Sequence, residues 1–378
     1  MNDKIRFALV GSGWRAEFYA RIARELPDQF ELTGTWLHSP EKGEAWQRRF
    51  GGRVAVRPEE LLQDRPDFLV LSLTKPAIPE MLSELMDLEI PVLCETPPFT
   101  DLETGLQLWE KACRKKAVIQ VAEQYQDWPV CQAWKRIIEE GLIGKVSNMS
   151  ISMVHSYHAA SLIRFLLDTG FQNMKISGRR FYFPVQASDS RGGIILNGKT
   201  EPAVRDRVTF EFEDGKVAFF DFGGIQYHTF IRTRHVNIQG DRGEIDDLTL
   251  RYLNAETLPI TDRLVRRDFG PYNNNPMSHF GIMLGDRYLY RNPFPYARLN
   301  DDEIAIATCL VRMKRMLEGE ETEAYPLAQA MQDAYIALEM EKALTHPGIT
   351  VQTETQPWAR PGQHAAGQVD DLSYPALF

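Results

Sequence analysis

A short apolar run near the N-terminus leads directly into a glycine-rich turn. Ile5–Val10 has the composition of a buried parallel strand, and the residues at 11–16 (GSGWRA) follow it with the spacing G-x-G-x-x-A. Apolar residues at helical spacing begin again at Phe18. A strand, a glycine turn and a helix in this order predict a βαβ unit whose helix N-terminus binds a phosphate group.

The turn residues have the properties that dinucleotide binding requires. Gly11 permits a tight turn, Gly13 lets the backbone approach a pyrophosphate, and the small Ala16 allows the helix to pack closely on the strand. The alternative is a glycine turn that binds nothing. We expect a nicotinamide dinucleotide to contact Gly11, Ser12, Gly13, Trp14 and Arg15.

The rest of the chain predicts two domains and a tail. Strand-like runs at 30–37, 67–73, 91–94 and 118–122 alternate with helical patterns, which predicts a doubly wound parallel α/β sheet. After Pro129 come an amphipathic helix at 130–140, strand-like segments at 208–213, 217–222, 229–239 and 244–252, and two helices at 301–317 and 326–344. We therefore expect a Rossmann domain at 1–125, an α+β domain with an open, mostly antiparallel sheet at 126–346, and an extended tail at 347–378.

Composition excludes several classes of function. The 378 residues carry a net charge of −9 and no Lys/Arg run stands out, so a nucleic-acid partner is not expected. Four scattered cysteines form no C-x-x-C pair, which indicates neither a zinc site nor disulfides, and no other metal site is indicated. No apolar stretch reaches about 18 residues, so we expect no membrane span, and the N-terminal run is a strand rather than a signal peptide. These features predict a cytoplasmic protein.

The end of the second strand bears on the choice between NAD and NADP. An acid is expected there when the cofactor is NAD, but the sequence reads Trp36-Leu37-His38-Ser39. Without that acid nothing repels a ribose 2′-phosphate, and His38, Ser39, Arg15 and Lys42 are candidate donors to it. The sequence therefore favours NADP slightly over NAD, with His38 alternatively an exposed loop residue.

Motifs along most of the chain resemble the Gfo/Idh/MocA family of oxidoreductases. They are GSGWRA at 11–16, PVLCETPP at 91–98, GLIGKV at 141–146, LNDDEIAIA at 299–307 and the late helix that begins AYPLAQAM at 324. The resemblance implies a Rossmann domain followed by an α/β domain whose open sheet covers the active site and builds dimers or tetramers. It also implies nicotinamide-dependent oxidation or reduction of sugars, polyols and related small molecules.

The chain departs from this family at the residues that move the proton. The family's Glu-Lys-Pro is Glu95-Thr96-Pro97 here, so the lysine that often assists proton transfer is missing. The Asp-x-Gly-x-His motif keeps only its last histidine, His158. We expect His158 to be the acid/base because the start of the following helix favours a neutral imidazole, with Tyr157 assisting. The alternative is that both are buried structural residues.

Further candidates lie at strand ends and near the second sheet. Ser72, Thr74, Glu95 and Gln124 follow strands of the first sheet and are expected to bind the cofactor, unless they make interdomain contacts. The expected substrate residues are Tyr125, His155, Arg164 and Tyr227; for Arg164 a structural ion pair is the alternative. Arg232 and Arg234, expected on one face of a strand, would bind a carboxylate or phosphate, or lie in a dimer interface.

Three functions are compatible with these features. The first is an NAD(P)-dependent oxidoreductase acting on a sugar, polyol or sugar acid. The second is a lyase or glycoside hydrolase that oxidises its substrate transiently with a tightly bound cofactor. The third is a protein that binds the dinucleotide without turnover.

Overall fold

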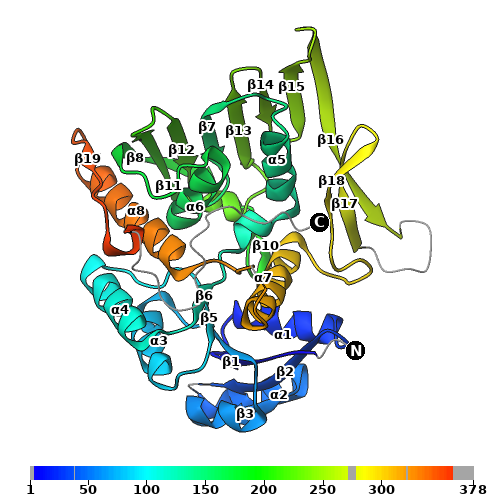
Figure 1. Cartoon of the computed structure of the whole chain (residues 1–378), viewed down its shortest axis with the longest axis vertical. Coiled ribbons are helices and arrows are strands. Elements are labelled where there is room, and N and C mark those ends of the chain that lie inside the picture. The colour runs from blue at the N-terminus through cyan, green and yellow to red at the C-terminus, as the bar shows by residue number, and fades with distance from the viewer. Residues whose placement is uncertain (1–3, 38, 271–277, 321, 361–378) are drawn as a thin grey trace.

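The chain folds into two sheets of different kinds that lie one above the other (Figure 1). The computed structural model describes residues 4–37, 39–270, 278–320 and 322–360. The first sheet is fully parallel, with the strand order β3-β2-β1-β4-β5-β6 of a Rossmann domain. Its elements are β1 (Ile5–Val10), α1 (Ala16–Glu25), β2 (Phe30–Trp36), α2 (Gly43–Phe50), β3 (Arg53–Ala55), β4 (Phe68–Leu71), α3 (Ile78–Asp87), β5 (Val92–Cys94), α4 (Leu102–Lys115) and β6 (Ile119–Val121).

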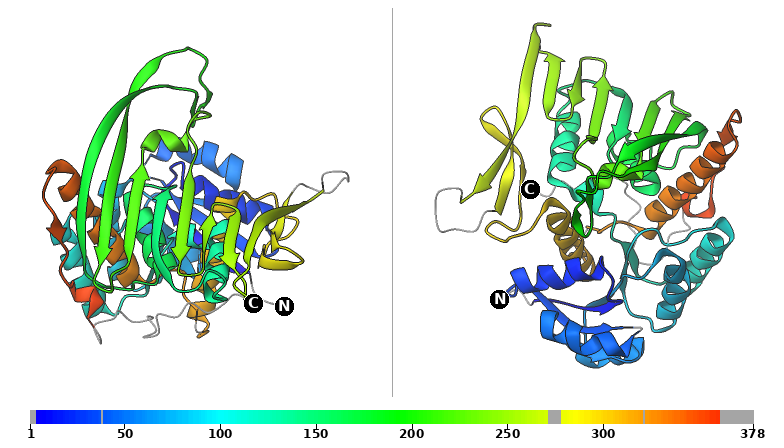
Figure 2. Two further views of the ribbon diagram at one scale, coloured as in Figure 1. Left: turned by 90° about the horizontal axis from the view of Figure 1, so that it is seen from above. Right: turned by 180° about the vertical axis from the view of Figure 1, so that it is seen from behind.

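The second sheet is mostly antiparallel and has eleven strands in the order β18-β17-β16-β15-β14-β13-β7-β12-β11-β8-β19. Only the β7–β12 pair within it is parallel. Its strands are β7 (Val146–Ser152), β8 (Met174–Gln186), β11 (Thr200–Phe212), β12 (Val217–Phe222), β13 (His235–Gly240), β14 (Gly243–Asp246), β15 (Thr249–Leu253), β16 (Pro259–Phe269), β17 (Ser278–Leu284), β18 (Arg287–Arg291) and β19 (Val351–Gln352). β8 and β11 curve well beyond the other strands, and the small hairpin of β9 (Asp189–Ser190) and β10 (Gly193–Ile194) lies between them in sequence (Figure 2).

Helices cover one face of the second sheet, and the other face is open. The covering helices are α5 (Pro129–Glu139), α6 (Ser156–Leu167) and α8 (Leu327–Thr345). Strand residues that point toward them are buried, for example Ile151 and Phe210, whereas Phe183 and Phe219 stay exposed on the sheet. The α/β fold expected from the sequence, a doubly wound parallel sheet followed by an open antiparallel one, is confirmed.

The second half of the chain returns to the first at two places. Helix α7 (Asp301–Leu317) packs against α1, and Lys314 Nζ lies 2.8 Å from Asp67 Oδ1. At the edge of the parallel sheet, the backbone N–H of Val121 donates to the carbonyl of Tyr325 at 2.8 Å. Both contacts hold the Rossmann sheet in a fixed position beside the residues that follow it.

Three local expectations differ from the structure. Residues 229–234 precede β13 as a loop rather than forming part of a strand, so Arg232 and Arg234 do not share a strand face. The segment expected as one strand at 244–252 is a hairpin, β14 and β15, because the chain turns at Asp247 with a positive φ of 53°. In the expected tail, residues 351–352 form a strand and 357–359 a 3-10 turn; residues 361–378, like His38, lie outside the described residues.

In the described parts of the chain, no helix is both long enough and apolar enough to cross a membrane.

Candidate active site

A cavity of about 1470 Å³ opens where the carboxyl ends of the parallel strands face the second half of the chain. Ligands bind at this edge in doubly wound sheets, because the strand order reverses there. The walls come from the glycine turn after β1, the loops after β4 and β5, the start of α6, the loop before β13 and the start of α7. Both halves of the molecule therefore contribute side chains to one site.

The glycine turn has room for a diphosphate. Gly11 has φ of +120°, and a Cβ placed on it would lie 2.1 Å from the Ser72 carbonyl oxygen, so only glycine fits. A Cβ on Gly13 would meet no atom within 4 Å, which leaves open space beside the backbone. No side chain caps the N-terminus of α1. The N–H groups and positive dipole end of α1 therefore suit the phosphates of a dinucleotide.

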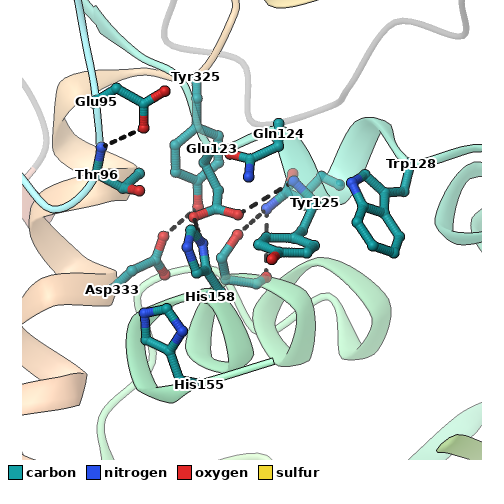
Figure 3. A network of polar contacts seen from close by, with 12 residues as sticks. Glu95, Thr96, Glu123, Gln124, Tyr125, Trp128, His155, His158, Tyr325 and Asp333 are labelled. Atoms are coloured by element: carbon teal, nitrogen blue, oxygen red, sulfur yellow. Dashed lines mark hydrogen bonds and ion pairs between the residues drawn. The ribbon is translucent and has the colours of Figure 1, made fainter. Parts of the chain in front are cut away.

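Two buried side chains form an acid–base pair on the floor of the cavity. His158 Nδ1 lies 2.6 Å from Glu123 Oε2, and the two residues are 4% and 2% exposed (Figure 3). Glu123 follows β6, and His158 is in the first turn of α6, so each half of the molecule supplies one partner. Burial lowers the pKa of His158, and Arg15 lowers it further; burial also raises the pKa of Glu123. Because the two buried groups are in direct contact, the protonation of one depends on that of the other.

Aromatic rings surround this pair. The ring centroids of Tyr157, Tyr125 and His155 lie 4.4, 4.5 and 4.9 Å from that of His158. Burial raises the pKa of both tyrosines well above its usual value, so their hydroxyls stay protonated. Burial, His158 and Lys75 lower the pKa of His155 to about 2, so its imidazole is neutral.

Tyr227 orients the ring of His155. Its hydroxyl accepts a hydrogen bond from the backbone N–H of His155 at 2.9 Å and lies 2.7 Å from the ring Nδ1. Within the described residues Nε2 has no hydrogen-bond partner. The Nε2 atom of His155 is thus available to a ligand beside His158.

Two carboxylates bind the guanidinium of Arg15. Its guanidinium lies 2.7 Å from Asp302 Oδ2 and 3.6 Å from Glu95 Oε1, and it stacks on Phe18. The Glu95 carboxylate also accepts a 2.7 Å hydrogen bond from Tyr19. Arg15 therefore joins the start of α1 to the start of α7 rather than extending a free guanidinium toward the end of β2.

The cavity brings together most of the residues expected from the sequence. The expected residues that line it are Gly11, Ser12, Gly13, Trp14, Arg15, Ser72, Thr74, Glu95, Tyr125, His155, Tyr157, His158 and Tyr227. Ser39 does not line it. Gln124 is fully buried and donates to Asp302 instead, so the expected contact of its amide with the cofactor has no support in this geometry.

Arg164 was expected to bind substrate, and this is wrong. Its guanidinium lies 2.6 Å from Asp333 Oδ1 inside the protein, where it lines a separate cavity of about 410 Å³ beneath α6 and α8. Arg164 and His158 lie six residues apart on one helix, which places them on different faces. The structural ion pair is the role that the structure shows.

Several residues of the site were not identified from the sequence. Glu123 could have been found, because it follows a parallel strand at the ligand-binding edge just as Glu95 does. Asp302 lies in the capped first turn of α7, but it also binds Arg15. Lys75 lines the cavity directly after the expected Thr74, whereas no spacing in the sequence links Arg191 to the cavity.

Comparison with protein families identifies the first domain. A parallel Rossmann sheet with this glycine turn is the architecture of a dinucleotide-binding domain. Residues 5–123 match the Gfo/Idh/MocA model, described as an oxidoreductase family with an NAD-binding Rossmann fold. The N-terminal domain thus belongs to that family, and the family resemblance seen in the sequence is confirmed. No curated protein sequence matches the chain.

Solved structures share the fold of both halves. An Agrobacterium radiobacter oxidoreductase in complex with NAD⁺, L-tartaric acid and magnesium is 15% identical, with a TM-score of 0.66 over 92% of this chain and 98% of that one. A putative myo-inositol dehydrogenase from Sinorhizobium meliloti is 15% identical, with a TM-score of 0.61 over 90% and 98%. Biliverdin reductase from Synechocystis, bound to biliverdin and NADP⁺, is 14% identical, with a TM-score of 0.60 over 90% and 99%. At these identities the similarity establishes the fold and not the substrate.

Proposed function

We propose that this protein oxidises or reduces a sugar, polyol or sugar acid with NAD(P), using His158 as the acid/base. The buried pair of His158 and Glu123 carries the proposal. His158 lines the same cavity as the glycine turn, and Glu123 contacts it from beyond the cavity lining. When bound, the nicotinamide accepts or delivers the hydride. The protein must then move one proton at the substrate oxygen.

The geometry of the pair suits that proton transfer. In the base form, Nδ1–H of His158 donates to the Glu123 carboxylate and leaves the lone pair of Nε2 free. Oxidation of an alcohol then transfers the hydroxyl proton to Nε2 while the hydride leaves the same carbon, and a carbonyl forms. Reduction runs the same steps in reverse. Glu123 orients the imidazole and stabilises its charged form, as a carboxylate does behind other catalytic histidines.

Neighbouring groups position the substrate oxygen. The unpartnered Nε2 of His155 and the protonated hydroxyls of Tyr157 and Tyr125 are polar groups beside His158 that a substrate oxygen would meet. Together they take the place of the family lysine, whose position is occupied by Thr96. The cofactor contacts proposed for Ser72, Thr74 and Glu95 are supported by their places at the ligand edge of the parallel sheet.

NADP remains the proposed cofactor. Its support is the absence of an acid at the end of β2 and the presence of Lys42 on the cavity wall. Arg15, bound by two carboxylates, is not part of that argument. Assembly as a homodimer or homotetramer through the open sheet face is also proposed; the exposed Phe183 and Phe219 on that face support it.

Absorbance at 340 nm tests the proposed reaction. Purified protein is mixed with NAD⁺, NADP⁺ or their reduced forms and a panel of polyols, sugars and sugar acids. We expect net turnover with at least one compound, and His158→Gln should lower kcat by about 10²- to 10⁴-fold while the cofactor Kd stays unchanged. His346→Gln, which changes an exposed histidine at the end of α8, is the matched control.

Two results would contradict the proposal. Product formed without net change at 340 nm would indicate transient oxidation by a retained cofactor. Cofactor binding without any product across the panel would indicate a protein that binds the dinucleotide without turnover. Full activity in His158→Gln would remove the acid/base role from this residue while leaving the reaction class intact.

A further inference from the structure

Two cations near His158 have no carboxylate partner. Lys75 follows β4 in the Rossmann half, and Arg234 precedes β13 in the second half. Both line the same cavity. No carboxylate among the described residues lies within 4 Å of either one.

Lys75 is held beside the aromatic rings of the site. Its ammonium lies 4.9 Å from the ring centroid of Tyr157, whose ring is in turn 4.4 Å from that of His158. The side chain is exposed to the cavity. Partial burial of the Lys75 side chain lowers its pKa, as expected for a cation that has no anion beside it.

Arg234 is fixed by the backbone but keeps one edge free. Its Nε and Nη2 atoms donate to the carbonyls of Gln226 and Tyr227 at 3.2 and 3.4 Å. The guanidinium stacks on Tyr227 at 4.8 Å, and the hydroxyl of Tyr227 binds His155. The contacts orient the guanidinium without neutralising it, so its Nη1 donors remain for a ligand.

Most acids of the cavity already have partners. Glu95 and Asp302 bind Arg15, and Asp301 binds Arg266. Asp189 lies 3.9 Å from His228, and Glu201 is exposed on a wall of the cavity. Among the described residues, none of these acids lies within 4 Å of Lys75 or Arg234, which come from different halves of the chain.

We infer that the substrate carries a carboxylate, which Lys75 and Arg234 bind from opposite halves of the molecule. This inference rests on the proposed function for the position of the reacting carbon, and it narrows the substrate to sugar acids or related hydroxy acids. A carboxylate matches the site better than a phosphate group. One planar edge of Arg234 and one ammonium suit two coplanar oxygens, whereas a phosphate presents three oxygens and close to two charges.

Binding of matched ligands tests the carboxylate site without requiring turnover. Calorimetry on the protein saturated with NADPH or NADP⁺ compares four- to six-carbon sugar acids with their neutral counterparts, for example D-gluconate with D-glucitol, and with D-glucose 6-phosphate. At least one acid should bind more tightly than its neutral counterpart. Lys75→Gln and Arg234→Gln should each weaken the binding of that acid by about 10- to 100-fold and change the neutral ligand less than about threefold.

Controls separate a specific site from general charge. Arg232→Gln removes an exposed arginine two residues from Arg234 that does not line the cavity, and it should leave binding of the acid unchanged. Lys75→Arg should recover part of the affinity. The cofactor Kd should be the same in every variant. If Lys75 instead contacted the cofactor, its substitution would raise that Kd.

The results also distinguish this inference from the proposed function. Acid binding that depends on both cations but gives no turnover supports the carboxylate site and contradicts the proposed reaction. Turnover of neutral polyols with no preference for acids, unchanged in both variants, supports the reaction and overturns the carboxylate site. Tighter binding of the phosphate than of every acid overturns the choice of carboxylate.

Discussion

Glu123 and His158 are the residues on which the proposed chemistry depends most directly. Both are buried, and burial alone disfavours the charged form of each. Their 2.6 Å contact couples the two groups, so a proton taken up at Nε2 of His158 offsets the negative charge of the Glu123 carboxylate. In the proposed mechanism, the pair supplies the acid/base in a chain that lacks the lysine of the family.

Removal of the carboxylate should change the pH profile in a defined direction. Oxidation requires the base form of the pair, so kcat/KM for oxidation should rise with pH through the apparent pKa of the pair. Reduction requires the acid form, so kcat/KM for reduction should fall over the same pH range. In Glu123→Gln the amide oxygen still accepts Nδ1–H, but no anion stabilises the imidazolium. The pKa of His158 should fall further, moving the acidic limb for oxidation to lower pH, and kcat should drop about 10²-fold or more.

Kinetics from pH 5 to 9 checks this expectation. Glu339→Gln is the matched control, because Glu339 is a buried carboxylate on α8 outside the cavity. A profile of Glu123→Gln that overlays the wild type would show that the carboxylate has no part in the proton transfer.

At the scale of elements, the turn between β1 and α1 combines two glycines with different roles. Gly11 is needed for folding, because its φ is positive and any Cβ would collide with the backbone after β4. Gly13 meets no neighbouring atom, so the folded chain alone does not require glycine there. A dinucleotide whose diphosphate approaches the backbone, as proposed here, would give a reason for glycine at this position.

Alanine at each glycine should separate these two roles. Gly11→Ala should lower the free energy of unfolding by about 1–3 kcal/mol, because the added Cβ strains the turn. Gly13→Ala should leave the unfolding free energy within about 0.5 kcal/mol of the wild type but weaken cofactor binding markedly. Denaturant unfolding and calorimetric titration measure the two quantities. Equal cofactor affinity in Gly13→Ala and the wild type would argue against a diphosphate at this turn.

At the scale of the whole molecule, the last described segment belongs to the core of the first domain. Trp358 has no exposed surface, and its ring contacts Phe99, Trp109 and Tyr335 at centroid distances of 6.0 to 6.4 Å. Its indole N–H donates to Gln332 on α8 at 2.8 Å. Residues from both ends of the chain therefore share one hydrophobic cluster.

Loss of this ring should destabilise the whole protein. Trp358→Ala should cost about 3–5 kcal/mol, because it removes a large buried side chain and leaves a cavity against α4. Ile349→Ala, which changes an exposed residue nine positions earlier, should cost less than about 0.5 kcal/mol. Thermal unfolding gives both values. A Trp358→Ala protein as stable as the wild type would show that the segment only rests on the surface.

The sequence predicts the features that depend on local pattern. The glycine turn, the alternation of strands and helices, and the start of α7 at Asp301 follow from residues close together in the chain. Partners that are distant in sequence do not: Glu123 with His158, Arg15 with Asp302 and Arg164 with Asp333 are joined by folding alone. The same limit explains why residues 229–234 were expected in a strand, since their alternation does not reveal whether a neighbouring strand pairs with them.

Helix α7 and residues 351–360 bear on any attempt to engineer this chain. A cofactor-binding module cut at residue 125 would lose the acid that holds Arg15, the ammonium that holds Asp67 and the indole that fills the space beside Trp109. Transplanting the dinucleotide unit into another protein would therefore require a discontinuous graft, made from the first 125 residues and two pieces drawn from the distal third of the polypeptide.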